Sequence, residues 1–320
     1  MMFDLNELYH AQEIVARAIA PTPQISWPLL SQRVGAEVWV KHENHTPVGA
    51  FKLRGGVVYV DELKRRQPNV TGVIAATRGN HGQSVAFAAS EAGLRVVIVV
   101  PHANSREKNA AMRALGAELI EHGSDFQDAY EHACRLAESQ GLHFVPSFGD
   151  ALVAGVASYA LELFRAVSDL AAVYVPIGLG SGICGTIAAR DALGLKTEVI
   201  GVVASGAPTY ALSFNAGRPI ASDTAQTIAD GMAVRVPDPR ALEIMLAGAS
   251  RIVTVDENEI QASMRHLFSD THNVAEGAGA AALAAFLQER HRMRGRRVAV
   301  ILSGGNVDRD VFAQTLGGNE

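Results

Sequence analysis

The chain has 320 residues, of which 48% are hydrophobic and 19% are charged, and its formal net charge is −5. This length and composition predict a globular protein of about two domains and exclude wholesale disorder. The negative charge provides no general attraction to nucleic acid or to an anionic membrane. The basic run at residues 290–297 lacks aromatic stacking partners, which favours a helix end over a nucleic-acid patch.

The two cysteines, Cys134 and Cys184, lie far apart in the sequence. This spacing argues against a disulfide framework or a cysteine zinc site and favours a reducing compartment. Asp4 and Glu7 interrupt the amino terminus, which does not have a signal-peptide pattern, and the apolar runs are too short to span a bilayer. We therefore expect a cytoplasmic protein that does not insert into membranes.

Short β-branched runs alternate with longer alanine-rich segments of helical spacing. An amphipathic helix is expected first, over residues 5–20, followed by helices over residues 83–92, 109–115, 126–139 and 183–193. Apolar runs predict strands at residues 38–41, 70–76, 95–100, 118–121, 172–176, 198–203, 251–255 and 297–303. This alternation predicts an α/β fold with mostly parallel sheets in two layered units. Ligands of such sheets bind beyond the carboxyl ends of the strands, so the turns there carry most information.

The first informative turn spans residues 41–56 and places Lys52 at the start of a helix. Apolar neighbours such as Phe51 and the cationic Arg54 would disfavour the ammonium form. They would leave a free amine that can attack an aldehyde. The alternative is an ordinary surface lysine.

The second turn spans residues 75–83 and follows another apolar strand. Gly79 and Gly82 allow the backbone to approach a ligand closely, and Asn80 supplies a donor and an acceptor. Amides at the start of the next helix can hold a carboxylate or a phenolate. The alternative is a plain turn capped by Asn80, with His81 as a structural hydrogen-bonding residue.

The third turn, residues 175–185, has three closely spaced glycines before an apolar helix, which suits a phosphate group. It matches neither a Walker loop nor the dinucleotide fingerprint. In the fourth turn, residues 298–306, Ser303 can hydrogen-bond a heteroaromatic nitrogen or its own turn. Residues 227–231 and 276–280 combine acids with glycines and predict either helix caps or site residues.

Together, in this order, these turns resemble the fold-type-II pyridoxal-phosphate enzymes, specifically the threonine/serine dehydratases and serine racemase. The resemblance runs from Thr22-Pro23 to the Ser303-Gly-Gly-Asn306 stretch. It implies two three-layer α/β domains of the tryptophan synthase β-like type. The large cofactor domain would comprise residues 1–44 plus 150–320 and the small domain residues 45–149, and the chain would form a homodimer.

The resemblance implies pyridoxal 5′-phosphate as the cofactor and Lys52 as the catalytic residue that binds it as an imine. Asn80 would contact the ring hydroxyl and Ser303 the ring nitrogen. The cofactor-binding residues implied are Lys52, Phe51, Asn80, Gly178, Leu179, Gly180, Ser181, Gly182 and Ser303. The substrate-binding residues implied are Thr77, Arg78, Gly79, Asn80 and His81.

The expected reaction converts a β-hydroxy-α-amino acid into a 2-oxo acid and ammonia. Lys52 would take the Cα proton, and the cofactor would accept the electrons. A neutral hydroxyl at the ring nitrogen favours prompt loss of the β-hydroxyl. The alternatives are an amino acid racemase or β-replacement synthase, and a non-catalytic protein that binds pyridoxal phosphate.

Four departures from the family pattern qualify this expectation. Ala50 replaces the usual serine of the lysine motif, and Thr77-Arg78 replaces a small pair such as Ser-Ser. Arginine is a poor general base, which disfavours racemisation. Arg78 can instead grip the substrate carboxylate or suit a bulkier substrate, such as phenylserine, hydroxyaspartate or a compatible-solute breakdown product.

The third departure concerns metal ligands and the fourth the end of the chain. Val203 and Thr209 stand where some relatives have acidic ligands, so no divalent metal is expected. The chain stops shortly after Asn306 without a regulatory domain, which favours a catabolic role.

Overall fold

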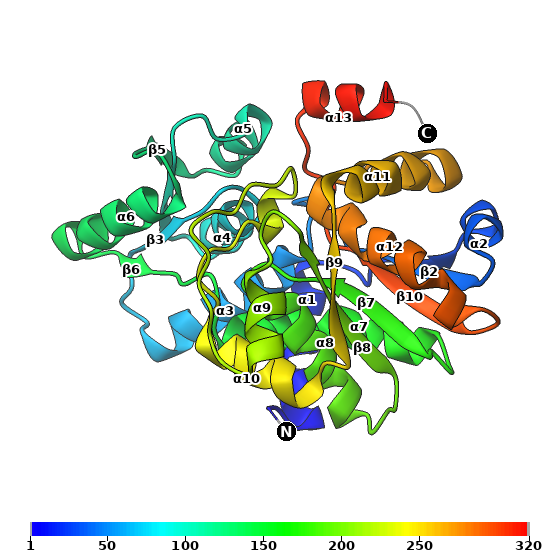
Figure 1. The fold of residues 1–320 in the computed structure, drawn as a ribbon. Helices are drawn as coiled ribbons and strands as arrows, with labels where there is room; N and C mark the ends of the chain where they lie inside the picture. The colour runs from blue at the N-terminus through cyan, green and yellow to red at the C-terminus, as the bar shows by residue number, and fades with distance from the viewer. Residues whose placement is uncertain (1, 319–320) are drawn as a thin grey trace.

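A computed structural model describes residues 2–318, which form a large and a small sheet, each between layers of helices (Figure 1). In sheet order, the six strands of the large sheet are β1 (Gln24–Ser26), β2 (Glu37–His42), β10 (Arg297–Leu302), β7 (Ala172–Pro176), β8 (Glu198–Ala204) and β9 (Arg251–Val255). The four strands of the small sheet are β5 (Glu118–Glu121), β4 (Arg95–Val100), β3 (Gly72–Ala76) and β6 (His143–Phe144). Neighbouring strands are parallel except for the pair β1 and β2. The predicted α/β fold is confirmed.

The helices follow the strands in alternation along the chain. The α-helices are α1 (Leu5–Ala18), α2 (Pro28–Val34), α3 (Lys52–Arg66), α4 (Asn80–Glu91), α5 (Arg106–Ala114), α6 (Phe126–Gln140), α7 (Asp150–Ala166), α8 (Ser181–Ala192), α9 (Thr209–Ala216), α10 (Pro239–Gly248), α11 (Glu257–Thr271), α12 (Gly277–Glu289) and α13 (Arg309–Leu316). The 3₁₀ turns are η1 (Glu43–His45), η2 (Asp230–Met232) and η3 (Arg290–Met293).

Because the strands are continuously apolar, they place apolar side chains on both faces of each sheet. In β7, Tyr174 packs with Phe286 of α12 on one face, whereas Val173 and Val175 belong to the core formed with α8 on the other. In the small sheet, α4 covers one face and α6 the other. Burial on both sides explains why these strands show no polar alternation in the sequence.

Two strands and several helix boundaries differ from the sequence prediction. β1 and β6 were not predicted, because runs of three and two residues give no periodic signal. α4 and α8 begin earlier than predicted, so glycine-rich loop residues form their first turns. The basic run starts directly after α12, and Gly295 there adopts a φ of 70°.

The two sheets meet along the carboxyl ends of their strands, where the candidate site lies. All four strands of the small sheet fall within residues 45–149, the range that we propose as the small domain. The yellow segment between α9 and α10 extends from the large sheet toward the small one (Figure 1). Across residues 2–318, none of the helices combines the length and the apolar character needed to cross a bilayer.

Candidate active site

A cavity of about 620 Å³ lies at the meeting of the two sheets. This volume falls within the range of roughly 300–1,000 Å³ that is typical of small-molecule sites. Side chains and backbone from the turns after β3, β7 and β10 line it. The structure brings all of the predicted site residues to this cavity: Phe51, Lys52, Thr77, Arg78, Gly79, Asn80, His81, Gly178, Leu179, Gly180, Ser181, Gly182 and Ser303.

Lys52 is the first residue of α3, and its amine lies inside the cavity. The Phe51 amide donates to the Ser303 carbonyl (3.0 Å), which fixes the start of this helix against the end of β10. The Lys52 Nζ atom lies 3.2 Å from Ser181 Oγ and 5.1 Å from the centre of the Phe51 ring. Burial lowers the pKa of Lys52 to about 8, because the charged ammonium loses its hydration.

The expectation that Arg54 disfavours the Lys52 ammonium was wrong. Arg54 is fully buried, and its guanidinium pairs with Glu43 (2.7 Å) and Glu162 (2.7 Å). Lys41 is 2.6 Å from Glu162 and completes a buried cluster of two cations and two carboxylates. Because the two acids offset the Arg54 charge, the low pKa of Lys52 results from burial.

The lowered pKa of Lys52 predicts how cofactor capture depends on pH. Only the free amine attacks an aldehyde, and with a pKa of about 8 roughly one molecule in ten carries it at pH 7. After removal of bound cofactor, the rate of imine formation should fall about tenfold per pH unit below 8 and level off above it. Stopped-flow absorbance of added pyridoxal phosphate measures this rate. A rate that keeps rising to pH 10 would contradict the assignment.

The glycine loop before α8 has the geometry of an anion site. A Cβ atom at Gly178 would lie 2.2 Å from the Gly231 carbonyl oxygen, and Gly180 adopts a φ of 107°. α8 has no side-chain cap hydrogen bond at its N-cap residue, Gly180, so its first amides can receive a phosphate. The Tyr210 hydroxyl donates to the Leu179 carbonyl (3.0 Å) and helps to hold the loop. These residues fit a cofactor with an aldehyde at Lys52 and a phosphate in the loop.

Asn80 is held by two partners from the large sheet. Its Nδ2 atom donates to Glu276 Oε1 (2.5 Å), and its Oδ1 atom accepts from Asn306 Nδ2 (2.8 Å). In the preceding turn, Thr77 Oγ1 accepts from the Gly79 and Gly82 amides (3.0 and 3.3 Å). The first residue of α4 therefore has a fixed orientation inside the cavity.

The local sequence does not mark Lys108 as a site residue, and it leaves the roles of Asp230 and Glu276 open. Lys108 Nζ lies 3.2 Å from Glu276 Oε2 and 3.6 Å from Asp230 Oδ2, and all three residues line the cavity. Burial favours a lower pKa for Lys108, but the two carboxylates outweigh it and raise the pKa. The acidic segments at residues 227–231 and 276–280 were a sequence signal, whereas nothing local distinguished Lys108.

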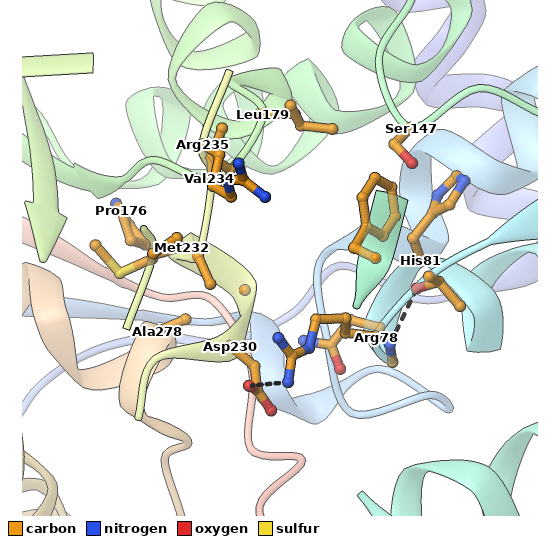
Figure 2. A pocket seen from close by; sticks show the side chains of 18 of the residues that line it. Arg78, His81, Ser147, Pro176, Leu179, Asp230, Met232, Val234, Arg235 and Ala278 are labelled. Carbon is orange, nitrogen blue, oxygen red and sulfur yellow. Dashed lines mark hydrogen bonds and ion pairs between the residues drawn. The ribbon is translucent and has the colours of Figure 1, made fainter. Parts of the chain in front are cut away.

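His81 and Arg78 form part of the wall contributed by the small sheet (Figure 2). Burial, and secondarily the nearby Lys52 charge, lowers the pKa of His81 to about 3, so its ring is neutral. Its buried Nε2 atom has no hydrogen-bond partner within residues 2–318. The Arg78 guanidinium points toward Asp230 of η2, on the part of the wall contributed by the large sheet (Figure 2).

Comparisons with known proteins agree with this geometry. The family model described as pyridoxal-phosphate dependent enzyme matches residues 15–304. An L-threonine ammonia-lyase of Thermotoga maritima is 34% identical over 96% of this chain and 76% of its own length. The processed form of threonine deaminase isoform 2 from Solanum lycopersicum superposes with a TM-score of 0.90, at 29% identity, over 99% of this chain and 95% of that one. Maize serine racemase gives a TM-score of 0.92 at 25% identity, over 99% and 97%.

The chain belongs to the pyridoxal-phosphate dependent enzymes of fold type II. Its relatives are threonine ammonia-lyases and dehydratases, so the predicted cofactor and the predicted class, a pyridoxal-phosphate dependent lyase, are confirmed. Some relatives are considerably longer: the chain spans 56% of the length of a biosynthetic threonine dehydratase of Pasteurella multocida, which is 34% identical over 90% of this chain.

Proposed function

We propose that the enzyme removes the β-hydroxyl and amino groups of a β-hydroxy-α-amino acid and releases a 2-oxo acid and ammonia. The observation that carries this proposal is the buried Lys52 amine, 3.2 Å from the glycine loop, in one cavity with Asn80 and Ser303. Relatives named threonine ammonia-lyase support it. Threonine and serine are the default substrates, and phenylserine and 3-hydroxyaspartate are bulkier candidates.

The proposed reaction gives each of these site residues a role. The amides of residues 178–182 bind the cofactor phosphate, and Asn80, oriented by Glu276, donates to the ring hydroxyl. Ser303 places a neutral hydroxyl at the ring nitrogen. When bound, the cofactor supplies a conjugated ring that accepts the electrons released at Cα. The Lys52 amine would take the Cα proton of the substrate.

The surroundings of Lys52 suit this role in proton transfer. Its pKa of about 8 lies close to neutral pH, where a general base combines a useful free fraction with adequate basicity. The Lys52 carbonyl accepts from Ser84 Oγ (2.7 Å), which fixes the backbone from which the amine extends. We also propose that the enzyme is a homodimer and that it is cytoplasmic, as expected from the sequence.

The test is to incubate the reconstituted enzyme with threonine, serine, phenylserine and 3-hydroxyaspartate and to measure 2-oxo acid and ammonia. Equal amounts of the two products are expected from at least one substrate. Absence of 2-oxo acid from every β-hydroxy amino acid tested would end the proposal. Deuterium from the solvent at Cα, with inversion and without elimination, would instead identify a racemase. An unchanged cofactor spectrum with all amino acids would indicate a non-catalytic protein.

A further inference from the structure

Arg78 carries hydrogen-bond donors that its surroundings leave unused. Its terminal nitrogen lies 3.7 Å from Asp230 Oδ1, beyond the usual hydrogen-bond distance of about 2.7–3.2 Å. Its Nε atom is buried and has no hydrogen-bond partner among the residues that the structure describes. Buried polar groups are paired in the great majority of cases, so the position of Arg78 is unusual. Its terminal N–H groups belong to a 41% exposed side chain in the cavity wall and are the donors that a ligand can reach.

Asp230 is shared with a second cation. Its other carboxylate oxygen lies 3.6 Å from Lys108 Nζ, and Lys108 in turn lies 3.2 Å from Glu276. The Lys108 side chain is 8% exposed, whereas that of Arg78 is 41% exposed. Lys108 is therefore held between two carboxylates, and Arg78 is the more accessible cation of this group.

We propose that Arg78 determines specificity by donating hydrogen bonds to an oxygen acceptor at the far end of the substrate side chain. This inference rests on the proposed function and narrows its substrate class. The favoured substrates are β-hydroxy amino acids with a carboxylate or amide beyond Cβ, such as 3-hydroxyaspartate and 3-hydroxyasparagine. Phenylserine has no such oxygen and would displace water from the guanidinium of the 41% exposed Arg78 side chain without replacing its hydrogen bonds, which carries a desolvation penalty.

The neutral ring of His81 adds a second polar group to the cavity wall, near Ser147 and away from the Arg78 guanidinium (Figure 2). It offers an unpaired Nε2 atom within residues 2–318, while Arg78 offers an unpaired Nε donor. A purely hydrocarbon side chain would leave both atoms without a partner.

The test uses amino acids that lack the β-hydroxyl and so cannot undergo the proposed elimination. Calorimetry would measure the binding of aspartate, asparagine and 2-aminobutyrate to the reconstituted enzyme, to Arg78→Ser and to the control Arg113→Ser. Arg113 is an exposed arginine of α5 that pairs with Glu121 outside the cavity. Arg78→Ser should weaken the binding of aspartate, asparagine or both roughly 10-fold to 100-fold. The affinity for 2-aminobutyrate should change less than about threefold, and the control should match the wild type.

Two binding results would overturn the inference. An equal loss for all three amino acids would mean that Arg78 grips the α-carboxylate, which every substrate has. Unchanged affinity for all three would mean that Arg78 does not contact the ligand and that its charge is only a solvent-exposed surface charge. A loss confined to aspartate or to asparagine identifies the acceptor as a carboxylate or an amide, and either supports the inference.

Turnover separates this inference from the proposed function. The wild type should prefer 3-hydroxyaspartate or 3-hydroxyasparagine to phenylserine in kcat/KM, and Arg78→Ser should reduce this preference at least about tenfold. A wild type that prefers phenylserine would overturn the inference. If no hydroxy amino acid reacts but the binding pattern holds, the proposed lyase function fails and the role of Arg78 stands.

Discussion

Replacement of Lys52 by alanine is expected to abolish lyase turnover and covalent cofactor binding together. The variant loses the buried amine with a pKa of about 8 that is assigned both to attack the aldehyde and to carry the Cα proton. Loss of a general base alone typically costs about 10²–10⁴-fold in rate, and loss of cofactor attachment adds to it. The glycine loop stays in place, so some noncovalent cofactor binding should remain. Product assays and mass spectrometry after borohydride reduction measure the two effects.

The matched control is Lys196→Ala, because Lys196 is an exposed lysine outside the cavity. It should retain wild-type turnover, and borohydride should still fix one cofactor per chain. A Lys52→Ala variant that keeps the covalent adduct and full activity would contradict the site assignment. A reduced adduct mapped by peptide sequencing to any other lysine would do the same.

Replacement of Arg54 by methionine is expected to destabilise the folded chain by about 3–5 kcal/mol. Arg54 contacts two buried carboxylates, and its removal leaves them with Lys41 as the remaining cation of the cluster. Burial alone would raise the pKa of Glu43, but the Arg54 guanidinium outweighs this effect and keeps the pKa below its usual range. This contribution to stability is fully present above the ordinary pKa of 4.5 and is lost as the pH falls through the folded value. Urea unfolding at pH 7 measures the loss.

Arg66→Met provides the control on the same helix. Arg66 is 78% exposed, and its pair with Glu62 should contribute at most about 1 kcal/mol. Adding Glu43→Gln to Arg54→Met should recover part of the lost stability, because it removes one of the uncompensated charges. Two results would contradict this account of the buried cluster. One is a free energy of unfolding for Arg54→Met within about 1 kcal/mol of the wild-type value. The other is a further loss of stability when Glu43→Gln is added to Arg54→Met.

The parts of the site that were predictable from sequence are those encoded in short local stretches. Lys52, Asn80 and Ser303 each follow the end of an apolar strand, and parallel strands bring such turns to one edge. What was missed depends on contacts between distant segments. Lys108 and Glu276 are in contact although they lie 168 positions apart in the sequence, and no local pattern marks that pair.

The same physical limit explains the errors in the fold and in the electrostatics. β10 lies between β2 and β7, and it pairs with β2 although more than 250 residues separate the two strands in the sequence. Hydrophobic periodicity does not encode such a long-range pairing. Arg54 was expected to affect Lys52 because the two are neighbours in sequence. One of its two actual carboxylate partners, Glu162, lies 108 residues away. Local sequence therefore predicted residues that the structure brings to one cavity, whereas their orientation and charge balance required the three-dimensional structure.

The central place of β10 in the large sheet sets an order for events on the ribosome. The small sheet draws its strands from residues 72–144 and can pair while synthesis is still in progress. β2 and β7 instead have to wait for residues 297–302, since β10 lies between them. Until then the nascent chain exposes apolar strand edges, which are prone to aggregation. Protection by chaperones during translation therefore matters most for the large sheet, which belongs to the domain proposed to bind the cofactor.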